Sequence, residues 1–119
     1  MIYVMKLLTG GSIYCILELL ARGHTHWTMF ILGGLCYAGC GFIYDISGPE
    51  TAVWQQMILC TIIITVLEFI TGLIVNILLG WNVWDYHKIP LNILGQICVP
   101  YMLLWFILSF PALMLNRYI

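Results

Sequence analysis

The sequence has very few charged residues for its length. Lys, Arg, Asp and Glu make up 8% of the 119 residues and give a net charge of −1, whereas about 25% of the residues in soluble domains are charged. Four basic residues cannot form the positively charged surface that nucleic acid requires. They also form no basic cluster for anionic lipids. The composition therefore excludes nucleic acid as a partner.

The sequence also lacks the short motifs of common chemistry. It contains no P-loop, no Cys-x-x-Cys or His-Glu-x-x-His motif and no Gly-x-Ser-x-Gly motif. The five cysteines all lie in apolar runs, where a thiol usually serves as a small packing residue. The chain cannot act as an ATPase by itself, and we expect no metal ion, cofactor or disulfide framework.

Apolar residues dominate what is present. They make up 63% of the chain, whose mean hydropathy is +1.04, and they fall into four runs separated by short polar turns. One membrane crossing takes about 20 residues. We therefore expect an all-α membrane protein with one transmembrane domain over residues 1–119, its first helix retained in the mature protein. The predicted helices cover residues 2–20, 27–44, 53–79 and 91–115, with Pro90 opening the fourth.

A weak internal repeat relates the two halves of the chain. Thr9-Gly10 aligns with Thr71-Gly72, and the residues of 31–36 align with those of 93–98 through a shared Ile-Leu-Gly-x-x-Cys. This pattern predicts two repeated helical hairpins. The turns 21–28 and 80–90 would then lie at the same face of the membrane, at a mouth between the hairpins.

Glu68 is the carboxylate that lies deepest in apolar sequence. A charged group at that depth costs about 2.5–3.5 kcal/mol on insertion scales, so it needs a partner, a proton or a function. Thr61, Thr65, Gly72 and Asn76 share its helical face. This stripe predicts either a hydrogen-bonded polar core or the lining of a path for a proton, cation or substrate.

The predicted mouth gathers most of the other polar residues. Arg, Lys and His beside Trp and Tyr suit a phosphate or carboxylate headgroup, although ordinary interfacial anchoring explains the same pattern. Glu18 and Arg22 are one turn apart, which predicts an ion pair. The candidate ligand-binding residues are Glu18, Arg22, His24, His26, Glu68, Asn76, Trp84, Asp85, Tyr86, His87, Lys88, Asn92 and Gln96.

Residues Leu67 to Cys98 resemble a family signature. Its pattern is a Glu-x-x-Thr-Gly helix, then Trp-Asp-Tyr, then Pro-x-Asn-x-x-Gly-x-Ile-Cys, found here at Glu68–Gly72, Trp84–Tyr86 and Pro90–Cys98. The sequence resembles the small four-helix bacterial membrane proteins described as ABC transporter permeases of the CmpB type, a domain of unknown function. The resemblance implies a bacterial cytoplasmic membrane, a separate ATPase subunit, and a Glu68 helix that acts as one unit with the Trp84–Tyr86 turn.

Three functions are compatible with these residues. The first is a transport component or permease-like subunit that binds a small anionic or lipid-headgroup ligand at an intramembrane polar site. The second is a membrane enzyme acting on a lipid headgroup, with Asp85 and a histidine as acid and base. The third is a structural partner without a ligand. A non-enzyme is favoured because no nucleophile motif is present.

The positive charges leave the orientation of the chain open. Lys6 and Arg117 lie on one side of the predicted bundle and Arg22 and Lys88 on the other. Because orientation follows the excess of Lys and Arg, this tie allows both orientations. We therefore expect a homo-oligomer surrounded by membrane lipids, and an antiparallel dimer is one arrangement that fits.

Overall fold

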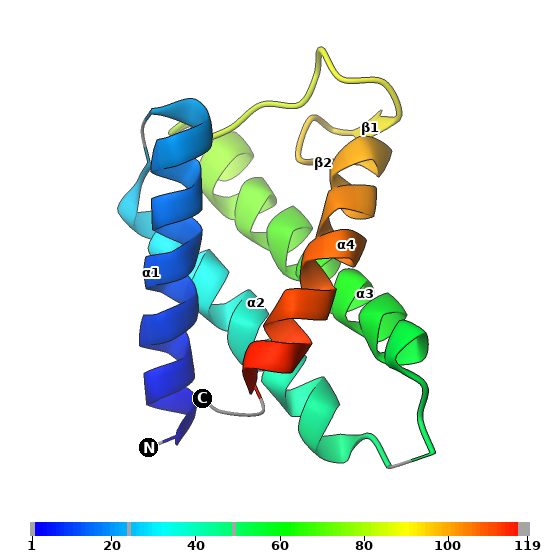
Figure 1. The fold of residues 1–119 in the computed structure, drawn as a ribbon. Coiled ribbons are helices and arrows are strands. Elements are labelled where there is room, and N and C mark those ends of the chain that lie inside the picture. The colour runs from blue at the N-terminus through cyan, green and yellow to red at the C-terminus, as the bar shows by residue number, and fades with distance from the viewer. Residues whose placement is uncertain (1, 24, 49, 117–119) are drawn as a thin grey trace.

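The computed structural model describes residues 2–23, 25–48 and 50–116 (Figure 1). Four long helices run alternately in opposite directions. They are α1 (Ile2–Arg22), α2 (Trp27–Ile46), α3 (Val53–Gly72) with its continuation as the π-helix η1 (Leu73–Leu78), and α4 (Val99–Asn116). Each is long and apolar enough to cross a membrane, which confirms the predicted all-α membrane fold. The longest dimension, 42 Å, is close to the roughly 40–45 Å of a bilayer with its headgroups.

Local sequence signals set the turn between α1 and α2. Gly23 follows α1 with a φ of 78°, and its amide donates a hydrogen bond to the Leu19 carbonyl at 3.0 Å. Glycine reaches this left-handed conformation without steric strain, so it ends the helix. The His26 ring then accepts a hydrogen bond from the Thr28 amide at 3.2 Å. This turn therefore stops one helix and caps the next.

Facing glycines bring α1 and α2 together. A Cβ atom added to Gly11 would lie 2.5 Å from the Phe30 carbonyl oxygen, and one on Gly34 would collide with the Leu7 carbonyl. Glycine at such positions lets the backbones of membrane helices approach closely. Gly11 and Gly34 therefore lie in a closely packed interface between α1 and α2.

The fourth helix begins at Val99, so the prediction that it starts at residue 91 was wrong. The preceding residues form a β-hairpin of β1 (Asn92–Ile93) and β2 (Ile97–Cys98). Leu91 and Leu94 have φ values of 61° and 53°, which a right-handed helix excludes. Pro90 therefore opens no helix, whereas Pro100 lies in the first turn of α4, where proline is tolerated.

The β-hairpin also makes the two halves of the internal repeat differ in structure. Residues 31–36 lie within α2, whereas the aligned residues 93–98 form the β-hairpin and its turn. Both halves still consist of two antiparallel helices (Figure 1). The long connection between η1 and α4 is what distinguishes the second half, and it positions the candidate site.

Candidate functional site

The connection between η1 and α4 folds back into the bundle. Trp84 and Tyr86 are only 3% and 8% exposed, while the side chains of Asp85 and His87 between and after them are 64% and 63% exposed. The buried pair packs against Met29, Leu32 and Cys98. The segment therefore alternates between aromatic side chains that are buried in the bundle and polar side chains that are exposed.

Glu68 lies at the centre of this arrangement. It is 2% exposed, and each of its carboxylate oxygens accepts one hydrogen bond. The Tyr86 hydroxyl donates to Oε2 at 3.0 Å and the Trp105 indole to Oε1 at 3.2 Å. Burial raises the pKa of the Tyr86 phenol well above its ordinary value, so Tyr86 stays protonated and can donate. The Glu68 helix and the Trp84–Tyr86 turn are thus linked directly.

Asn76 holds the start of the connection against the bundle. Its Oδ1 accepts hydrogen bonds from the amides of Val83 at 2.7 Å and Trp84 at 3.4 Å, and its Nδ2 donates to the Gln96 side chain at 2.8 Å. The Trp84 indole donates to the Gln96 backbone carbonyl at 3.0 Å. Asn76 and Gln96 are therefore occupied in binding the connection to η1.

Asn92 has a similar role within the hairpin. Its Nδ2 donates to the carbonyl of Ile89 at 2.9 Å, and its Oδ1 accepts from the Gly95 amide at 3.1 Å. An amide side chain that bonds to nearby backbone groups stabilises a turn. All three amides that the sequence assigned to a ligand thus have partners within the chain.

Glu18 and Arg22 form the predicted ion pair. Their Oε2 and Nη1 atoms are 2.9 Å apart, and the two side chains are 8% and 36% exposed. The pair ends α1 at the same face of the bundle as the connection, because the His26 ring after it lies 6.0 Å from the Trp81 ring, centroid to centroid. This contact supports the predicted mouth, while Lys88 is exposed there and His24 lies outside the described residues.

Asp85 and His87 form an exposed pair at the mouth. The His87 amide donates to Asp85 Oδ1 at 2.9 Å, and the His87 ring bonds to the same oxygen. These bonds, chiefly the one from the amide, hold the pKa of Asp85 below its ordinary value. Within residues 2–23, 25–48 and 50–116, no three His, Cys, Asp or Glu side chains form a group that could hold a metal ion.

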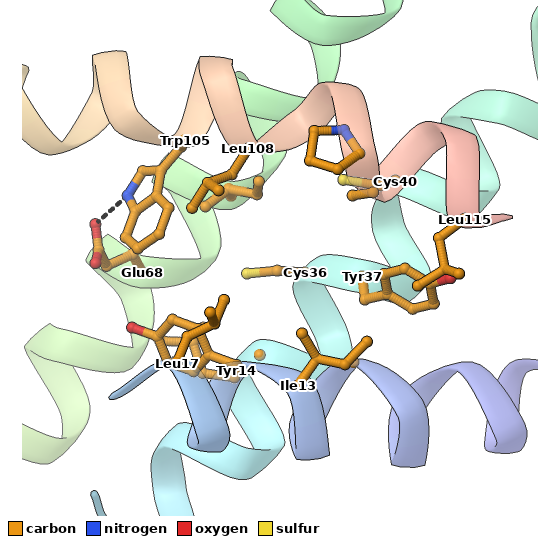
Figure 2. A pocket seen from close by; sticks show the side chains of 16 residues that line it. Ile13, Tyr14, Leu17, Cys36, Tyr37, Cys40, Glu68, Trp105, Leu108 and Leu115 are labelled. Atoms are coloured by element: carbon orange, nitrogen blue, oxygen red, sulfur yellow. Dashed lines mark hydrogen bonds between the residues drawn. The ribbon is translucent and has the colours of Figure 1, made fainter. Parts of the chain in front are cut away.

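A cavity of about 360 Å³ lies beside Glu68, between α1, α2, α3 and α4. Figure 2 shows Glu68 and Trp105 at one end and Tyr37 and Leu115 at the other. The lining is almost entirely apolar and includes exposed residues of α1, Ile13 and Leu17, together with Pro111 of α4. The cavity therefore opens sideways between α1 and α4.

Sequence reasoning missed several residues of this cavity. Tyr14, Tyr37 and Trp105 line it, and the Tyr37 hydroxyl is buried without a hydrogen-bond partner among the described residues. The only available signal was for Tyr14, which shares the inward face of the first helix with Glu18. Aromatic residues in apolar runs are common, so the other two carried no signal that distinguished them from packing residues.

The far end of the bundle holds a buried lysine that the sequence also did not reveal. Lys6 is 2% exposed, and its Nζ donates a hydrogen bond to Asn116 Oδ1 at 2.6 Å. Gly41 leaves room for both groups. Lys6 had been counted only as one of the charges that set orientation, while Arg117, the other charge on that side, lies outside the described residues.

The chain matches the family described as Putative ABC-transporter type IV over residues 2–118. The chain belongs to this family. The match confirms the resemblance at residues 67–98 and extends it across all four helices. Comparison with curated proteins and with solved structures gave no match. The family and the four membrane spans identify a membrane protein of a transporter type.

Proposed function

We propose that this protein is the membrane-embedded subunit of a transport system and that the cavity beside Glu68 holds the transported molecule. The molecule is lipid-like and enters from the bilayer between α1 and α4. One observation carries this proposal: an apolar cavity with the carboxylate of Glu68 in its wall opens on the side of the helix bundle.

The size of the cavity suits one part of a lipid-like molecule. Ligand pockets measure about 300–1,000 Å³, so the 360 Å³ available here is at the lower end of that range. A polar head and the first part of one hydrocarbon chain would fill it. The rest of the chain would stay in the bilayer, which the sideways opening allows.

The remaining parts of the transport system follow from what the sequence lacks. Residues 1–119 contain no P-loop, so ATP hydrolysis belongs to a separate subunit. Arg22 and Lys88 at the mouth contact the headgroups of the surrounding lipid in this proposal, because cationic side chains at that depth attract phosphates. The membrane is the bacterial cytoplasmic membrane, and the subunit works as an oligomer.

The hydrogen bonds of Asn76 and Gln96 favour a second candidate, a structural subunit without a ligand. Both amides are occupied within the chain. In that case the cavity would be a packing defect filled by lipid tails of any kind, and its occupants would show no selectivity.

Filling the cavity tests the proposal. Leu108 lines the cavity, whereas Leu103 on the same helix is 62% exposed and serves as the matched control. The two variants Leu108→Trp and Leu103→Trp are compared with the wild type by native mass spectrometry after extraction with membrane lipid. We expect a lipid-like adduct on the wild type and on Leu103→Trp, and its loss from Leu108→Trp. Identical spectra for the three proteins would refute the cavity as the site.

A further inference from the structure

The cavity has one ionisable group of the Asp, Glu, Lys, Arg and His types. Of the described residues in its wall only Glu68 belongs to these types. A carboxylate in an otherwise apolar wall repels an anion and attracts a cation, and it does so strongly where water is scarce. The anionic ligand expected from the residues of the mouth is therefore disfavoured inside the cavity.

Glu68 has acceptor capacity to spare. A carboxylate offers about four lone-pair sites, and the hydrogen bonds from Tyr86 and Trp105 use one on each oxygen. The two bonds hold the carboxylate in place from the connection and from α4. The remaining sites are available to a hydrogen-bond donor that enters the cavity.

Aromatic rings stand next to this carboxylate. The Tyr14 and Trp105 rings are 6.2 Å apart, centroid to centroid, with a 56° angle between their planes, and both line the cavity beside Glu68 (Figure 2). A cation within about 6 Å of an aromatic face gains roughly 0.5–2 kcal/mol. Carboxylate and rings together suit an ammonium group, while Ile13 and Leu17 suit a hydrocarbon chain.

We infer that the ligand of this cavity is an amphiphile with a cationic amine head, which binds at Glu68 beside the Tyr14 and Trp105 rings. Its hydrocarbon chain leaves between α1 and α4. This inference rests on the proposed function, because it names the class of molecule that the same cavity takes. It goes further by requiring a positive charge and a chain on the same molecule.

Photoreactive amphiphiles test the charge. Three probes share one diazirine-bearing dodecyl chain and end in an amine, an alcohol or a carboxylate; each is irradiated with the protein in nanodiscs, and labelled peptides are identified by mass spectrometry. We expect the amine to label cavity residues about tenfold more than the carboxylate, a ratio that corresponds to about 1.4 kcal/mol. Equal labelling of the cavity by all three would overturn the inference and leave the proposed function standing.

Two variants test whether Glu68 and Tyr14 cause the preference for the amine probe. Glu68→Gln keeps the volume and one acceptor oxygen, so we expect the amine-to-carboxylate ratio to fall to about one while chain labelling persists. Tyr14→Leu leaves the carboxylate and its two donors in place and should lower the ratio about threefold, in line with the loss of one aromatic contact. A wild-type ratio in either folded variant contradicts the inference.

Controls distinguish a failure of the proposed function from a failure of the inferred amine selectivity. They also distinguish a lipid-like amine from a free amine as the ligand. Labelling at exposed Leu103 without any labelling of the cavity by the three probes would refute the proposed function itself. Excess ethanolamine, an amine without a chain, is added as a competitor. Unchanged labelling supports a lipid-like amine, whereas displacement by ethanolamine would show that the site takes free amines and would overturn the requirement for a chain.

Discussion

The two helical hairpins of this protein are held together by different means. α1 and α2 approach through glycines, and a Cβ on Gly11 or Gly34 would meet the backbone of the opposite helix. α3 and α4 are instead joined by the hydrogen bond from Trp105 to Glu68, and the connection between them is fastened by the side chains of Glu68 and Asn76. One hairpin uses close backbone contact, and the other uses buried polar groups.

The difference teaches how an apolar chain can build a cavity. Helices that meet through glycine approach closely at the glycine positions. Polar side chains of α3 and η1 form hydrogen bonds to Tyr86, Gln96 and Trp105, so the second half of the bundle is joined through polar groups rather than through close backbone contact. The cavity accordingly lies between the tight hairpin and α4, with Glu68 in its wall.

The largest effect should come from breaking the tight hairpin. Gly34→Val places a branched side chain against the Leu7 carbonyl, where neither backbone can move away easily. We expect a loss of about 3 kcal/mol in the free energy of unfolding, measured by denaturant titration in micelles. Leu35→Val at the neighbouring position, 41% exposed, is the control. Equal stability of the two variants would show that the glycine contact is dispensable.

Removing the amide of Asn76 should have the next largest effect. Asn76→Leu leaves the partly buried amide of Val83 and the buried amide of Trp84 without their acceptor, and an unsatisfied buried donor costs about 1–3 kcal/mol. We expect unfolding to become easier by about 2 kcal/mol and the Val83 amide to exchange hydrogen faster. Asn76→Asp keeps the acceptor and should protect that amide better than Leu does. Slow exchange in Asn76→Leu would argue against the amide as the fastening group.

A smaller effect is expected at the bond between the connection and Glu68. Tyr86→Phe removes the hydroxyl that donates to Oε2 but keeps the ring stacked on Tyr101, 4.7 Å away between centroids. The loss should be about 1 kcal/mol in thermal unfolding. Tyr44→Phe, outside the connection, serves as the comparison. A Tyr86→Phe protein as stable as the wild type would mean that ring packing alone holds the connection.

The smallest effect concerns the exposed pair at the mouth. Because the folded pKa of Asp85 lies below its ordinary value of about 3.9, its contribution to stability is complete above that value and is lost as pH falls through the folded pKa. His87→Ala removes the ring bond but keeps the amide bond, so carboxylate NMR should show a partial rise in the pKa of Asp85. Glu50→Gln, at the other end of the bundle, should leave it unchanged.

How much of the fold could be predicted depends on what each residue pattern can distinguish. Apolar length predicted the four helices correctly, and spacing predicted the Glu18 and Arg22 pair. Residues 91–98 are rich in apolar side chains, and periodicity in so short an apolar run cannot distinguish a strand from a helix. The left-handed conformations of Leu91 and Leu94 are unusual for leucine, so the residue types gave no indication of them.

The candidate site was predictable only in part. The isolation of Glu68 in apolar sequence identified it, because a buried carboxylate needs a partner. Its hydrogen-bond partners could not be identified from the sequence, since Trp105 comes from another helix and Tyr86 from the connection between η1 and α4. Tyr86 and Trp105 lie 18 and 37 residues from Glu68 in the sequence, and no local sequence pattern predicts contacts at such separations.

The hydrogen bonds of Glu68 also constrain the order in which the chain can assemble during synthesis. α1 and α2 can pair as soon as both have been made, because their contacts join neighbouring segments. Glu68 must wait for Tyr86, 18 residues later, and for Trp105, 37 residues later, so it enters the bilayer before either donor exists. A chain interrupted before α4 would hold a finished first hairpin beside a carboxylate with Tyr86 as a donor but without Trp105, and that half-satisfied acid would distinguish an incomplete product from a complete one.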